Sequence, residues 1–238
     1  MAGAFSYIKD NVERVLSLCA ERAERLGVSI PTLLAVTKSA TDEEVRALVS
    51  QYGQTRIAEN RTDMFLRRQA LFEEGDAPEM HLIGHLQTNK VKYIIGKTAY
   101  IHSLDSRRLA EEIERQAEKH GVERVRVLLE VNSGREEAKG GVLPEAALGF
   151  AEEILSFPRL SLCGVMTMAP ICESEAAYRP YFRETAAIFR ALQDRGLLGK
   201  DAILSMGMSH SFTAAMEEGA TMIRVGRSLF EKPSEILA

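Results

Sequence analysis

The 238-residue chain has no tryptophan, only three cysteines and no apolar run long enough to span a bilayer. Cys19, Cys163 and Cys172 are odd in number and lack metal-ligand spacing, so they are expected to be reduced packing residues in a reducing cytoplasm. A basic excess is also missing, because the net charge is -4, which argues against nucleic acid or an anionic membrane as a partner. Residues 1–10 do not resemble a signal peptide. These absences predict a soluble cytoplasmic protein.

Another missing feature is the glycine-rich turn that a dinucleotide-binding sheet carries after its first strand. The corresponding segment, residues 37–41, reads Thr-Lys-Ser-Ala-Thr. An open doubly wound sheet is therefore less favoured than a closed barrel.

What the chain does contain is a regular alternation of short apolar runs and longer amphipathic segments, which is typical of parallel strands joined by helices. Eight such runs and the length of the chain predict one α/β domain over residues 1–238, a (β/α)₈ TIM barrel. The strands are expected at 33–37, 55–59, 81–84, 99–103, 126–131, 162–168, 202–205 and 222–225. Helices are expected at 42–51, 61–73, 106–120, 144–155, 175–195 and 213–218, and an extra N-terminal helix at 7–26 is expected to cover the barrel floor.

The carboxyl ends of barrel strands carry the active groups in this architecture. Lys38 ends the first apolar strand, where desolvation at the barrel mouth would free its amine to attack an aldehyde. A solvated lysine at a strand end is the alternative.

The loops after the last two strands offer a place for a phosphate. Residues 205–209 read Ser-Met-Gly-Met-Ser, and Gly226-Arg227-Ser228 follows the eighth strand, so both loops supply hydroxyls and a glycine. Arg224, just inside the eighth strand, needs an acceptor, which is either the pyridine nitrogen of pyridoxal 5′-phosphate (PLP) or a strand carboxylate such as Glu59 or Glu130.

Other polar residues near strand ends have two interpretations each. His81 and His85 are too far apart on a strand to share a metal ion. His85 either faces the mouth or caps a helix, and Asn60 either contacts the ligand ring or caps the next helix. Lys90 and Lys139 are rival lysines, and Lys139 is expected in a surface loop.

Segments along nearly the whole chain resemble the signature segments of the pyridoxal phosphate homeostasis proteins, also called the YggS/PROSC family. They are Leu-Ala-Val-Thr-Lys at 34–38, Glu-Asn at 59–60, His-Leu-Ile-Gly-His-Leu-Gln-Thr-Asn-Lys at 81–90, Ser-Leu-Asp-Ser at 103–106, Glu-Val-Asn at 130–132, Gly-Val-Met-Thr-Met at 164–168, Ser-Met-Gly-Met-Ser at 205–209 and Arg-Val-Gly at 224–226. The chain departs from the family pattern at Arg61, Arg227 and Glu231, where a tyrosine, a small hydroxyl residue and a glycine are more usual.

The resemblance implies a barrel like the N-terminal domain of alanine racemase, with PLP bound to Lys38 as a Schiff base. It also implies a role in PLP homeostasis and carriage and in amino-acid balance, without an established catalysed reaction. The residues expected to contact the cofactor are Lys38, Asn60, His85, Met168, Ser205, Met206, Gly207, Met208, Ser209, Arg224, Gly226 and Arg227.

Three functions remain open on the sequence. A PLP carrier that delivers the cofactor to apo-enzymes is favoured, because no second domain follows the eighth strand to supply a racemase base. The alternatives are a racemase-like PLP enzyme, with His85 or Lys139 as the base, and a Schiff-base aldolase. A monomer without a metal is expected.

Overall fold

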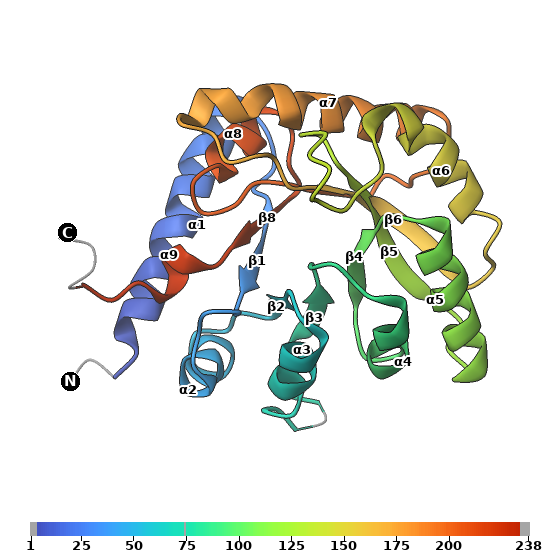
Figure 1. Cartoon of the computed structure of the whole chain (residues 1–238). Helices are drawn as coiled ribbons and strands as arrows, with labels where there is room; N and C mark the ends of the chain where they lie inside the picture. The colour runs from blue at the N-terminus through green and yellow to red at the C-terminus, as the bar shows by residue number, and fades with distance from the viewer. Residues whose placement is uncertain (1–3, 74, 234–238) are drawn as a thin grey trace.

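The chain closes into a barrel of parallel strands surrounded by helices (Figure 1). The computed structural model describes residues 4–73 and 75–233, and within these the eight strands follow one another in chain order, with β8 pairing in parallel with β1. The predicted fold class is therefore confirmed. The strands are β1 (Thr32–Val36), β2 (Arg56–Glu59), β3 (Glu79–Leu82), β4 (Tyr100–Leu104), β5 (Val125–Val131), β6 (Leu160–Thr167), β7 (Ile203–Ser205) and β8 (Met222–Val225).

The helices form the outer layer. The longer ones are α1 (Ser6–Leu26), α3 (Thr62–Gln69), α5 (Arg107–Lys119), α6 (Ala147–Ile154) and α7 (Glu175–Asp194). Shorter pieces are α2 (Asp42–Arg46), which continues as the π-helix η1 (Ala47–Gln51), then η2 (Thr88–Lys90), α4 (Val91–Ile94), η3 (Pro144–Ala146), α8 (Phe212–Glu217) and α9 (Arg227–Phe230). No helix in the described part of the chain combines the length and apolarity needed to cross a bilayer.

Strand alternation separates two apolar clusters. Side chains of Leu34, Val36, Ala58, Ile83 and Met222 pack together inside the barrel. Their neighbours along the strands, such as Leu33, Ala35, Ile57, Ile223 and Val225, pack outward against the helices. Because successive side chains on a strand point to opposite faces, the interior face can be followed from each strand into the loop beyond it.

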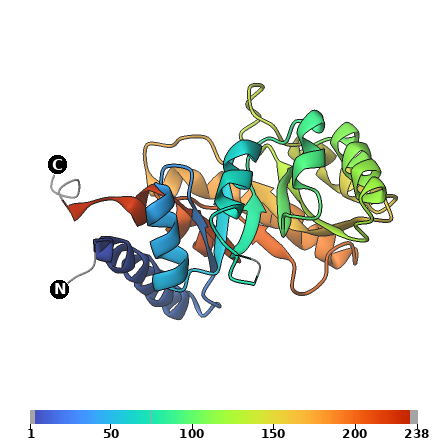
Figure 2. The ribbon, with the colours of Figure 1, turned by 90° about the horizontal axis from the view of Figure 1, so that it is seen from below.

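The N-terminal helix does not cover the barrel floor, so that expectation was wrong. Its buried stripe, which includes Val12, Val15 and Cys19, packs in the outer layer, where α1 contacts α8, α9 and η1. Two views place α1 beside the red C-terminal segment (Figure 1, Figure 2). A single apolar stripe suits this place, because it has helices on one side and solvent on the other. Burial raises the pKa of the Cys19 thiol to about 11, and all three cysteines are free.

Several element boundaries differ from those expected. β3 begins at Glu79, two residues before the predicted start. The sequence did not show this start, because the inner face of β3 carries polar Glu79 and His81, which obscure the apolar pattern. α3 ends at Gln69, four residues early, where the N–H groups of Leu71 and Phe72 bond three residues back and tighten the last turn. The helices α4 and α9 were not predicted, since four residues are too few to show a helical period.

Caps at the ends of helices were predicted more accurately. Thr41 accepts a hydrogen bond from the Glu44 N–H while the Glu44 carboxylate accepts one from the Thr41 N–H, which is a complete capping box. The glycines expected to adopt left-handed conformations after helices all have positive φ, namely Gly53, Gly121, Gly196 and Gly219.

Candidate functional site

The predicted site residues that follow β1, β2, β3 and β8 lie at one end of the barrel. Lys38, Asn60 and His85 each stand two residues beyond an inward side chain, which places them on the continuation of the inner face. The β1–β8 register pairs Ala35 with Val225, and a Cβ added to Gly226 would lie 3.0 Å from the Val36 carbonyl oxygen. The loop after β8 therefore passes close beside the strand that leads to Lys38.

The loop that carries Lys38 is held from outside the barrel. Lys38 and Ser39 are exposed, so the expected desolvation of this amine by the mouth is not seen, whereas Thr37 and Ala40 on either side are buried. The carbonyl oxygens of Thr37 and Ala40 accept hydrogen bonds from Arg68, a residue that is only 1% exposed. An exposed amine is thus presented by a loop with fixed ends.

Arg68 also explains what Glu59 does. The Glu59 carboxylate accepts hydrogen bonds from the Thr37 hydroxyl (2.6 Å) and from Arg68 Nε (3.2 Å) on the outer side of β2. Burial raises the pKa of Glu59, although both hydrogen bonds oppose that rise. Glu59 is therefore committed to Arg68 and is not a partner of Arg224.

Asn60 presents an unsatisfied group at the mouth. Its Oδ1 atom is buried and has no hydrogen-bond partner among the described residues, which is costly unless a ligand or water supplies a donor. The loop after β3 presses on the same residue, because a Cβ added to Gly84 would lie 2.2 Å from the Asn60 carbonyl oxygen. The orphaned amide oxygen fits a bound polar molecule.

A Gly84→Ala variant is expected to lose about 1 to 3 kcal/mol of stability, because the new methyl group must displace the Asn60 backbone. Urea unfolding measures this loss. Gly149→Ala in α6 is the matched control, since nothing lies within 4 Å of its added Cβ and alanine favours a helix. Equal stability of the two variants would contradict the close approach at Asn60.

Three titratable side chains gather on the far side of the mouth. His85 is exposed, and its Nδ1 atom lies 3.7 Å from Asp105 Oδ2. A Cβ added to Gly140 would meet both Asp105 Oδ2 and Glu130 Oε2, at 3.1 and 3.5 Å. Burial and the nearby Asp105 raise the pKa of Glu130 to about 7, and Arg224 partly offsets the rise. Asp105 was not among the predicted site residues, although it lies in one of the segments that resemble the family, because a single carboxylate after a strand does not indicate a role by itself.

Arg224 lies at the centre of the barrel, 3% exposed. Its Nη1 donates to Ser205 Oγ and its Nη2 to the Thr167 carbonyl oxygen, both at 2.8 Å. Burial lowers the pKa of Arg224 to about 10, so the guanidinium remains charged at neutral pH. A buried cation held by neutral acceptors can still donate toward the mouth.

The loop after β7 differs in detail from the expectation. Ser205 and Met206 are fully buried, with the Ser205 hydroxyl engaged by Arg224 and the Met206 side chain in the outer core. Gly207 has φ 90°, and a Cβ there would lie 2.6 Å from the Ala215 side chain. Met208 is exposed, while Ser209 and the residue after β6, Met168, are half-buried. Within the described residues, the backbone N–H groups without an acceptor in the two loops include those of Gly207, Ser209, His210 and Gly226.

The loop after β8 is fastened to the N-terminal helix. Asn11 of α1 donates to the carbonyl oxygens of Leu229 (3.3 Å) and Glu231 (2.9 Å). Arg14 lies 3.5 Å from the Ser228 carbonyl oxygen. The segment that contains Arg227 therefore has a fixed position beside the mouth.

The rival lysines have other neighbours. Lys139 pairs with Glu136 inside the loop after β5, which closes on itself where the Val142 N–H bonds the Glu130 carbonyl oxygen. Lys90 ends η2, with its ammonium 5.7 Å from the ring centre of Tyr93.

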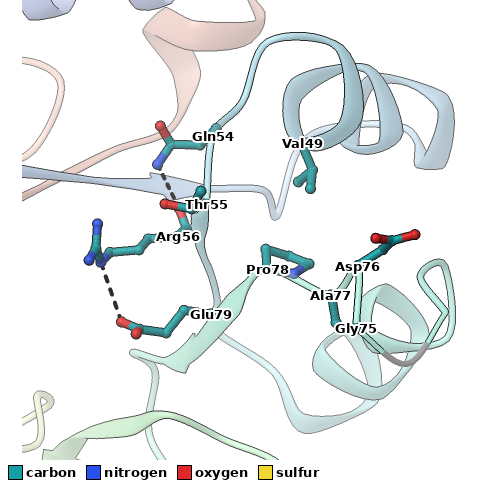
Figure 3. A pocket seen from close by; sticks show the side chains of 9 residues that line it. All are labelled: Val49, Gln54, Thr55, Arg56, Gly75, Asp76, Ala77, Pro78 and Glu79. Carbon is teal, nitrogen blue, oxygen red and sulfur yellow. Dashed lines mark hydrogen bonds and ion pairs between the residues drawn. The ribbon is translucent and has the colours of Figure 1, made fainter.

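Two hollows lie at the opposite end of the barrel. One, of about 450 Å³, is lined by residues of η1 and of the loops that precede β2 and β3, and Figure 3 shows Arg56 and Glu79 paired at its edge. The other, of about 360 Å³, opens at the barrel floor, where strand-starting residues such as Thr32, Glu79 and Tyr100 line it. Neither contains a residue from the carboxyl ends of the strands, so the mouth remains the candidate site.

Known proteins match nearly the whole chain. The family model of the alanine racemase N-terminal domain matches residues 8–232. The pyridoxal phosphate homeostasis protein of Aquifex aeolicus is 42% identical over 219 residues, which cover 92% of this chain and 93% of that protein. A protein of the same name from Deinococcus radiodurans is 38% identical over 222 residues, with 92% and 99% covered.

Solved structures also match the chain over nearly its whole length. PipY of Synechococcus elongatus, solved with PLP bound, is 32% identical with a TM-score of 0.74, over 90% of this chain and 100% of that one. Alanine racemase of Clostridium difficile, at 18% identity and a TM-score of 0.71, shares the fold over 92% of this chain and 60% of its own. The chain is therefore a member of the pyridoxal phosphate homeostasis protein family, the YggS/PROSC family.

Proposed function

We propose that the chain binds PLP at the carboxyl end of the barrel, held as a Schiff base on Lys38, and serves PLP homeostasis and amino-acid balance. The main support for this proposal is the register of β1 and β8, which brings the Lys38 loop beside the Gly226 loop. The names of the relatives and the PLP-bound PipY structure support the same cofactor.

The residues present fit the parts of this cofactor. Bound PLP supplies an aldehyde that condenses with an amine, and Lys38 is the amine at this rim. The acceptor-free N–H groups of the two loops, with Arg227, suit the phosphate dianion. Arg224 is a donor for the ring nitrogen, and the orphaned Asn60 amide oxygen suits a hydroxyl donor of the ring. His85, Met168, Met208 and Ser209 complete the proposed wall.

The exposure of Lys38 favours carriage over a sealed catalytic site. Enzymes that use reactive carbanions exclude water, whereas an open lysine lets a ligand enter and leave. We propose a carrier whose recipients are apo-enzymes that require PLP, and we further propose that it is cytoplasmic and monomeric.

Reductive trapping tests the proposal. The full chain is incubated with PLP, treated with borohydride and digested, and the phosphopyridoxyl mass is expected on the peptide that contains Lys38, after a visible absorption band appears. Pyridoxine 5′-phosphate, which lacks the aldehyde, is the control and should leave no mass. Trapping on Lys90 or Lys139, or on no lysine, would refute the assignment.

A further inference from the structure

A continuous line of polar side chains runs through the barrel interior beneath the candidate site. Arg224 Nη1 lies 2.8 Å from Ser205 Oγ, which lies 3.3 Å from His102 Nδ1. His102 Nε2 lies 2.8 Å from His81 Nδ1, and His81 Nε2 lies 2.9 Å from Glu79 Oε1. The three middle side chains are completely buried. Five side chains from β8, β7, β4 and β3 thus connect the mouth with the floor hollow that Glu79 lines.

The two ends of this line give it one direction. Arg224 can only donate, and an ionised Glu79 can only accept. His81 must therefore carry its proton on Nε2 to reach Glu79, which leaves its Nδ1 as an acceptor for the Nε2 proton of His102. The Nδ1 atom of His102 then accepts the Ser205 hydroxyl proton, while Ser205 accepts from Arg224. Each link is satisfied with both histidines neutral.

The surroundings keep these charge states. Burial lowers the pKa of both histidines, His102 the more strongly, and the nearby Arg224 adds to the effect on His102. His81 faces Glu79, which opposes the lowering, and Arg56 and Arg126, which assist it. Tyr100 stacks on His81 at 4.9 Å between ring centres. The hydrogen bond from His81 lowers the pKa of Glu79, so the lower end stays ionised.

We propose that Ser205, His102 and His81 are positioning residues, a one-way hydrogen-bond relay that fixes Arg224 as a charged donor below the mouth. This rests on the proposed function, because the acceptor would be the ring nitrogen of PLP. Ser205 and the Thr167 carbonyl oxygen hold both terminal nitrogens of the guanidinium, so its remaining N–H groups have a fixed direction. The relay ends on a carboxylate acceptor, so it offers the ring nitrogen a hydrogen bond and no proton.

The first test needs no cofactor. Long-range ¹H–¹⁵N spectra of the ¹⁵N-histidine-labelled apo-protein report which nitrogen of each imidazole carries the proton. His81 and His102, assigned through His81→Gln and His102→Gln, are expected to be neutral and protonated on Nε2 at neutral pH. A proton on Nδ1 of either ring, alone or as imidazolium, would overturn the relay.

The second test removes one link. Ser205→Ala leaves Arg224 Nη1 without its acceptor and is expected to weaken PLP binding about tenfold, as measured by equilibrium dialysis. It should also shift the His102 Nδ1 resonance downfield, which a purely structural loss would not do, and Ser205→Thr should restore both values. Thr185→Val is the matched control, because it removes a buried hydroxyl that bonds only the Tyr181 carbonyl oxygen of its own helix.

The outcomes separate the two proposals. If the wild type binds PLP, and Ser205→Ala binds it with the same affinity and shows the same His102 resonances, the relay is overturned and the proposed function stands. A wild-type chain that binds no PLP would overturn the proposed function, and the apo-protein tautomers would still decide whether the relay exists.

Discussion

A Lys38→Ala variant is expected to lose borohydride trapping of PLP completely while keeping the stability of the wild-type chain. The substitution removes the amine and the methylene groups that carry it, and this side chain is exposed and makes no hydrogen bond or ion pair within the described residues. We expect the loop after β8 to stay in place, because a Cβ added to Gly226 would meet Val36, which the substitution leaves unchanged. Mass spectrometry of the reduced protein and urea unfolding measure the two effects.

The control is Lys90→Ala, which removes a lysine at the surface of η2 and should trap PLP as the wild type does. A visible band or a covalent adduct that survives in Lys38→Ala would show that another amine carries the aldehyde.

Arg68→Leu is expected to destabilise the fold by about 3 to 5 kcal/mol, because it leaves the Glu59 carboxylate buried without its charged partner. It also frees the carbonyl oxygens of Thr37 and Ala40, so the Lys38 loop should lose hydrogen-exchange protection. Chemical unfolding and exchange at the Ala40 amide test both consequences.

Arg67→Leu is the matched control for Arg68, because the neighbouring side chain pairs with the same Asp42 but is 61% exposed. It should change the unfolding midpoint little.

The pH dependence of the stability lost in Arg68→Leu gives a further check. Burial raises the pKa of Glu59, so without Arg68 the folded chain binds that proton more tightly than the unfolded chain, and the deficit should shrink as pH falls toward about 4. A deficit that grows on acidification would contradict the role given to Glu59.

The barrel was predictable because each strand repeats a pattern of apolar residues that only burial between layers explains. The order of the loops then placed Lys38, Asn60 and Gly226 at one rim without any knowledge of contacts. Cap residues such as Thr41 were equally readable, since a capping box is local in sequence.

What could not be predicted depends on contacts between distant residues. Arg68 reads as one of several arginines in an amphipathic helix, and only the fold shows that it is buried against Glu59. His102 lies in β4 beside a second polar residue, Ser103, so the sequence does not show which of the two faces the barrel interior. The expected exposure of Ser205 to phosphate also depended on which face of β7 it occupied, and in the barrel its hydroxyl serves Arg224. The position of α1 follows from its fit beside α9, which no local pattern reveals.

The hydrogen bonds from Asn11 to the segment after β8 join the first helix of the chain to its last loop. These two segments are synthesised more than 200 residues apart. In the same way, β1 can pair with β8 and close the barrel only after β8 has been synthesised. The segment after β8 can acquire its final shape only after Glu231 has been synthesised, because α1, which holds it, lies far earlier in the chain. We therefore expect nascent chains that end before Glu231 to lack this support and to bind PLP poorly.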